Sequence, residues 1–110
     1  MTAADSIGAG APTAVEANRR SAERRLRISV ISPSAAAFSG AATSIIAPAH
    51  DGELGILYGH APMVVLLGEG LLHIRTDDGP HRFRVARGFL QVLDNTVAVL
   101  AEEVEPHAEG

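Results

Sequence analysis

Histidine is the side chain in this sequence best suited to holding a metal ion or moving a proton, and the chain contains five of them. Their spacing supports neither role, because no H-x-H, H-x-x-x-H or H-E-x-x-H arrangement occurs. The densest polar group consists of His50, Asp51 and Glu53, with His60 a little further along. We interpret this segment as a turn with solvated side chains, and a metal-dependent barrel enzyme remains as a minor alternative.

The residues needed for other kinds of catalysis are missing or badly spaced. No serine lies in a G-x-S-x-G elbow, and Ser39-Gly40 is interpreted as a turn between strands. The absence of cysteine excludes thiol chemistry and disulfides, and a phosphate loop needs a lysine that the sequence does not contain. The acidic pairs Asp77-Asp78 and Glu102-Glu103 are expected to be solvated. We therefore predict no catalytic site, no metal and no cofactor in this chain.

Composition points to one globular domain with a limited range of partners. The 110 residues are 46% hydrophobic and 20% charged. The net charge is -4 and all cations are arginine, which argues against nucleic acid as the main partner. The longest apolar run, residues 63–67, is far shorter than the roughly 20 residues that a membrane-spanning helix needs, so no membrane insertion is predicted.

Both ends of the chain are predicted to lie outside the folded domain. Residues 1–25 are rich in small and polar side chains and have no apolar period, so we expect a disordered or weakly helical extension there. Four of the arginines fall in its second half, among glutamates, which is typical of a solvated segment. Residues 105–110 are expected to form a short tail, which leaves residues 26–104 for the domain.

Residues 26–104 have the pattern of an all-β protein. Leu26, Ile28 and Val30 alternate with polar residues, as in a strand that has one buried face. Further β-rich runs follow at residues 43–47, 54–57, 63–67, 71–76, 81–87, 89–93 and 96–101, separated by turn residues. No helical apolar period is present. The predicted fold is a two-sheet antiparallel β-sandwich of about 8–10 short strands.

The segment around Gly52-Glu53-Leu54-Gly55-Ile56 and Gly59-His60-Ala61-Pro62 is unusual for a structural loop. Its glycines favour close approach of the backbone, and the Ala61-Pro62 step is rigid. Two interpretations remain open. The segment forms tight turns in which His60 caps a backbone group, or it forms an edge that docks a partner.

These motifs, taken in order, resemble the amino-terminal β-sandwich domain of the epsilon subunit of F-type rotary ATP synthases. The resemblance covers about residues 26–103. It rests on Phe38-Ser39-Gly40, the two glycine-rich motifs above, Gly70, Gly88-Phe89-Leu90-Gln91-Val92 and Thr96-Val97-Ala98-Val99-Leu100-Ala101. Each motif is weak alone, but their order and spacing are specific.

The resemblance implies a non-catalytic rotor subunit of the central stalk that links the gamma subunit to the c ring. It places the subunit at the cytoplasmic face of the cell membrane as a peripheral component. Glu53 would face the polar loops of the c ring, with His60 close by on the same surface. Gly52, Leu54 and Gly59 would share this partner-binding region.

Several questions stay open at this point. The family usually continues into an inhibitory helical hairpin, which we expect this chain to lack. The coupled ion, proton or sodium, and the sandwich face that meets gamma are undetermined. A free-standing β-sandwich module that binds a small ligand or carbohydrate is the alternative function.

Overall fold

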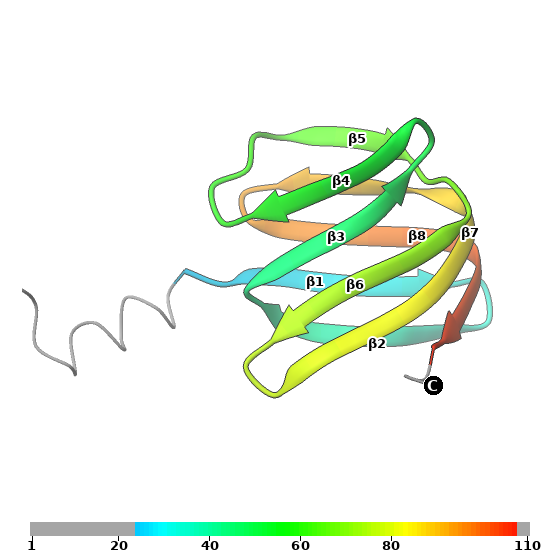
Figure 1. The fold of residues 1–110 in the computed structure, drawn as a ribbon, viewed down its shortest axis with the longest axis horizontal. Helices are drawn as coiled ribbons and strands as arrows, with labels where there is room; N and C mark the ends of the chain where they lie inside the picture. The colour runs from blue at the N-terminus through cyan, green and yellow to red at the C-terminus, as the bar shows by residue number, and fades with distance from the viewer. Residues whose placement is uncertain (1–23, 108–110) are drawn as a thin grey trace, which may run out of the picture.

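The structure is a computed structural model that describes residues 24–107. The extension predicted for residues 1–25 therefore lies almost entirely outside the described residues. Within residues 24–107 the chain forms strands and turns, with no helix (Figure 1). The strands are β1 (Leu26–Ser32), β2 (Ala35–Ala42), β3 (Ser44–Ala49), β4 (Gly52–Leu57), β5 (Met63–Leu66), β6 (Gly70–Thr76), β7 (Gly79–Leu93) and β8 (Thr96–Pro106).

The strands form two layers that share the longest strand, β7. The hydrogen-bonded order is β2-β1-β8-β7-β6-β3-β4, and β5 also pairs with β7. The first layer consists of β2, β1, β8, the second half of β7, and β5 (Figure 1). The second layer consists of the first half of β7, β6, β3 and β4. All pairs are antiparallel except β1 with β8. The predicted β-sandwich is confirmed.

The long strand β7 passes from one layer to the other at Arg87 and Gly88. Before this point the odd-numbered Phe83 and Val85 face the core, and after it the even-numbered Leu90 and Val92 do so. Arg87 has a left-handed backbone conformation with φ of 58°, which breaks the strict alternation of an extended strand. The change of face lets one strand contribute to both layers.

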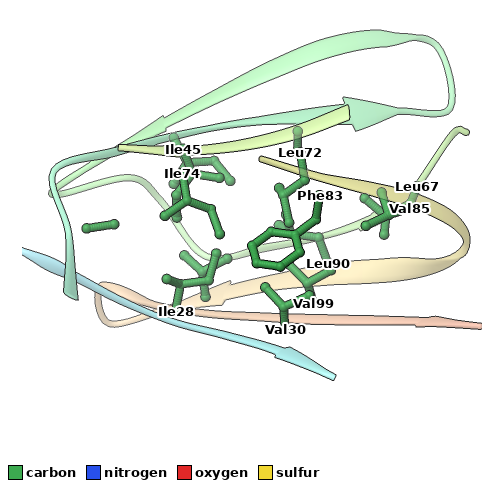
Figure 2. Packing of buried hydrophobic residues seen from close by; sticks show 14 of the residues in the cluster. Ile28, Val30, Ile45, Leu67, Leu72, Ile74, Phe83, Val85, Leu90 and Val99 are labelled. Carbon is green, nitrogen blue, oxygen red and sulfur yellow. The ribbon is translucent and has the colours of Figure 1, made fainter. Parts of the chain in front are cut away.

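The core between the layers is aliphatic, with Phe83 as its buried aromatic side chain (Figure 2). Among the described residues no polar or charged side chain is buried. Each fully buried aliphatic side chain contributes roughly 1.5–3 kcal/mol relative to exposure, so this cluster is the main favourable term in folding. Its members include Leu26, Ile28, Val30, Ile45, Ile56, Leu72, Ile74, Val85, Leu90, Val92, Val97 and Val99.

Some elements differ from those expected from sequence. Ser39-Gly40, expected to be a turn, lies inside β2 and pairs with β1. The expected strands at residues 81–87 and 89–93 are one continuous strand, β7. Strand β8 continues to Pro106, beyond the predicted domain end at residue 104, because it keeps pairing with β7. The rest of the predicted tail, residues 108–110, lies outside the described residues.

Candidate functional site

Glu53 lies at the start of β4, just after the hairpin that joins β3 to β4. Gly52 precedes it with φ of 136°, a conformation that favours glycine. Glu53 is exposed and pairs with Pro48 across the hairpin, while Leu54 packs against the core. The Glu53 side chain also borders a shallow pocket of about 150 Å³ on the outer face of the second layer, together with His73. The hairpin thus presents a carboxylate to solvent.

Gly59 and His60 lie in the loop between β4 and β5. Gly59 has φ of 88°, and its backbone N–H donates to the side-chain oxygen of Asn95 at 2.6 Å. The backbone N–H of His60 donates to the carbonyl oxygen of Leu57 at 3.1 Å, and its Nδ1 lies 2.9 Å from the carbonyl oxygen of Ala61. These contacts describe a tight turn with His60 at a backbone group, one of the two interpretations left open by the sequence.

The structure does not bring Glu53 and His60 together. Glu53 is the second residue of β4, and His60 lies in the loop that follows the end of this strand. The distance along β4 from Glu53 to Leu57 alone is about 13 Å at the usual rise per residue. The expectation that His60 lies close to Glu53 on one surface is therefore wrong. The partner-binding roles of Gly52, Glu53, Leu54, Gly59 and His60 stay predictions.

Asn95 was expected from the sequence only as a turn residue together with Asp94, yet it ties three segments together. It sits in the turn between β7 and β8 with φ of 60°. Its side chain accepts from Gly59, and its carbonyl oxygen accepts the backbone N–H of Arg27 at 2.9 Å. The sequence could indicate the turn, because asparagine prefers left-handed turn positions. It could not indicate the contact of Asn95 with the β4–β5 loop.

A second surface, unforeseen from sequence, is a row of large apolar side chains across the outer face of the first layer. Pairing places Ile31 beside Leu100, Leu100 beside Phe89 and Phe89 beside Leu66. We call these four residues the apolar row. They are 39%, 39%, 42% and 66% exposed in that order. The row crosses four strands, so it is a contiguous apolar patch.

The apolar row borders a hollow of about 510 Å³. Arg87 and Glu102 line the same hollow. A hollow bordered by apolar side chains with charged groups at one side is suited to receiving side chains of another protein. The sequence did not reveal it, because its residues come from distant parts of the chain.

Arg87 binds two carboxylates of β8, and we call Arg87, Glu102 and Glu103 the Arg87 clamp. Its Nε donates to Glu102 Oε1 at 3.1 Å, and its Nη2 donates to Glu103 Oε2. The hydrogen bonds to Glu103 and then Glu102 raise the pKa of the Arg87 guanidinium above its usual value. Glu102 and Glu103 were expected to be solvated charges. Both are exposed, and both are also paired.

Within residues 24–107 no three side chains of His, Cys, Asp or Glu gather as a metal site would require. The same part of the chain forms no helix that is long and apolar enough to span a membrane. The surface of this β-sandwich domain carries the apolar row, the Arg87 clamp and the Glu53 hairpin.

Comparison with known proteins identifies the family. Residues 25–107 match the family model described as ATP synthase, Delta/Epsilon chain, beta-sandwich domain, and the chain belongs to this family. The resemblance noted from the motifs is confirmed.

Several similar proteins are named as ATP synthase epsilon chains. The chain is 41% identical over 78 residues to an ATP synthase epsilon chain from Leptospira borgpetersenii, covering 71% of this chain and 61% of that protein. It is 41% identical over 81 residues to an ATP synthase epsilon chain from Exiguobacterium sp., covering 73% and 60%. The chain thus spans about three fifths of the length of these relatives. The expected lack of a helical hairpin stays a prediction.

Two solved structures share the fold. A chain in the Euglena gracilis mitochondrial ATP synthase, in its OSCP/F1/c-ring portion, matches with a TM-score of 0.70 at 22% identity, covering 76% of this chain and 54% of that one. A chain in the central stalk and c-ring portion of the Tetrahymena thermophila mitochondrial ATP synthase matches with a TM-score of 0.63 at 19% identity, covering 72% and 64%.

Proposed function

We propose that this chain is a non-catalytic rotor subunit of a rotary ATP synthase, linking the gamma subunit to the c ring and coupling ion transport to ATP synthesis. Its family membership and the names of its relatives support the proposal. The single structural observation that carries it is the apolar row on the first layer. In this role the subunit is a peripheral component at the cytoplasmic face of the membrane.

The apolar row is the surface that we assign to gamma. Leu66 and Phe89 leave much of their apolar area in contact with water. A contiguous exposed apolar patch often marks a site of interaction with another protein. A stable protein interface buries roughly 1,200–2,000 Å² in total, which covers several strands of a small sandwich. A face that crosses four strands offers a suitable area.

The Glu53 hairpin is the surface that we assign to the c ring. Glu53 belongs to the second layer and borders a pocket with His73 and Arg82 there, while the apolar row lies on the outer face of the first layer. Glu53 also borders a second pocket, of about 480 Å³, together with Leu66 of the apolar row, so the two surfaces lie on different layers but meet at one edge of the sandwich. Two partners bound to these surfaces would be neighbours, which suits a linking subunit.

Co-expression with the gamma subunit of the same complex tests the proposal. We expect a one-to-one complex at micromolar concentration on size-exclusion chromatography. Leu66→Gln should weaken this complex, because it removes an apolar contact from the row. Leu57→Gln is a matched control, since Leu57 is 63% exposed against 66% for Leu66 but lies on the second layer.

Separate elution of gamma and the unaltered chain would overturn the proposed function. Equal weakening by Leu66→Gln and Leu57→Gln would overturn the assignment of gamma to the apolar row.

A further inference from the structure

We infer that the Arg87 clamp selects a basic side chain on the protein that docks on the apolar row. The inference rests on the proposed function, because the docking protein is taken to be gamma. It adds the chemistry that gamma must present, namely an apolar patch with one arginine or lysine at its edge.

The Arg87 clamp is continuous with the apolar row. In the pairing of β7 with β8, Phe89 lies beside Leu100 and Gly88 beside Ala101, so Arg87 falls opposite Glu102. The clamp is thus the next exposed pair along the two strands, about 7 Å from the row at the usual strand rise. Arg87 and Glu102 also line the hollow that the row borders. A protein covering the row would meet the clamp at the end of the hollow.

The charges of the clamp do not cancel. One guanidinium faces two carboxylates, which leaves about one negative charge at this end of the row. Arg84, an exposed arginine on the same strand β7, is paired with Glu69 at 2.9 Å. Arg84 is therefore engaged by another carboxylate and does not neutralise the excess negative charge of the clamp. A positive charge on the docking surface would complement it.

The conformation of Arg87 also points to a function for its side chain. A φ of 58° is uncommon for a residue other than glycine, asparagine or aspartate. Glycine would adopt it without a steric penalty, but only a side chain such as arginine reaches both carboxylates. The guanidinium hydrogen-bonds to both Glu102 and Glu103, and Glu102 lines the hollow. A carboxylate that is already hydrogen-bonded loses less side-chain entropy when it binds an arginine or lysine than a freely moving one.

Association kinetics with purified gamma, measured at low and at moderate salt, test the inference. The double variant Glu102→Gln/Glu103→Gln removes the carboxylate charges and should slow association at low salt about three- to tenfold, with a flatter dependence on salt. Arg87→Asn removes the positive charge while asparagine tolerates the left-handed conformation, so it should speed association. If the clamp only supported the fold, both variants would associate with gamma more slowly.

Asp77→Asn is the matched control. Asp77 also accepts from an arginine, Arg25, and its side chain is 68% exposed against 67% for Glu102. It lies in the turn between β6 and β7, which belongs to the second layer, whereas the apolar row lies on the first. We expect this variant to associate at the unaltered rate.

The outcomes separate the two proposals. If gamma does not bind the unaltered chain, the proposed function and this inference both fail. If gamma binds, but the double variant associates at the same rate with the same salt dependence, only this inference fails. A slower rate for Arg87→Asn in a folded domain would also contradict it.

Discussion

Gly88 on β7 approaches Leu100 on β8 so closely that no side chain fits between them. A β-carbon on Gly88 would lie 1.9 Å from the carbonyl oxygen of Leu100 and 2.6 Å from the α-carbon of Ala101. The contact occurs beside Arg87, where β7 changes layers. The backbone of β7 bends against β8 at this point, and glycine is required because its neighbours are backbone atoms that cannot rotate away.

Gly88→Ala should therefore destabilise the domain strongly, by about 3 kcal/mol, since the methyl group forces two paired strands apart. The free energy of unfolding from urea denaturation measures the effect. Gly55→Ala is the control, because nothing lies within 4 Å of a β-carbon at that position. Similar stabilities of the two variants would show that β7 and β8 separate easily.

The hydrogen bond from Gly59 to Asn95 should hold the β4–β5 loop in place. Asn95→Gly keeps the left-handed turn but removes the acceptor, so we expect a loss of about 1 kcal/mol and faster exchange of the Gly59 amide hydrogen. Asn95→Asp keeps an acceptor oxygen and should retain slow exchange. Hydrogen exchange followed by NMR distinguishes them, and unchanged protection in Asn95→Gly would contradict the role of Asn95.

Substitutions of a buried leucine and of a leucine in the apolar row should affect different properties, the first the stability of the domain and the second the binding of gamma. Leu72→Ala removes a fully buried side chain and should cost about 2–5 kcal/mol. Leu66→Ala alters an exposed member of the apolar row and should change the free energy of unfolding by only about 0.5 kcal/mol, while weakening the gamma complex. Urea denaturation and gamma binding measure both. A large loss of stability in Leu66→Ala would place this residue in the core instead.

Glu53→Gln should leave the fold intact and weaken coupling between ion flow and ATP turnover. Glu53 is exposed in a hairpin, and a partly desolvated pair with a basic group of the c ring would contribute about 1–3 kcal/mol. Ion pumping by membranes that carry the variant, measured at several salt concentrations, tests this. Asp51→Asn in the same hairpin is the control. If the variant pumps as well as the unaltered complex, Glu53 is not part of the contact with the c ring.

The sequence by itself determined the all-β class, most strands and the family. Alternation along β1 identified its buried face, and glycine or Asx residues marked most turns, because side-chain alternation and turn preference are local properties of the chain. The strand β2 escaped detection. Alanine has little preference for strands, and residues 35–42 are extended because β1 offers them hydrogen-bonding partners.

Only the tertiary structure decided which surfaces exist. The apolar row needs the registers of three strand pairs, and the Arg87 clamp needs the bend of β7 that sets Arg87 opposite Glu102. Glu53 and His60, close in sequence, lie apart because β4 is extended between them. Register and bending depend on backbone contacts between segments distant in the chain, such as Gly88 against Leu100, and no local pattern of residue types encodes them.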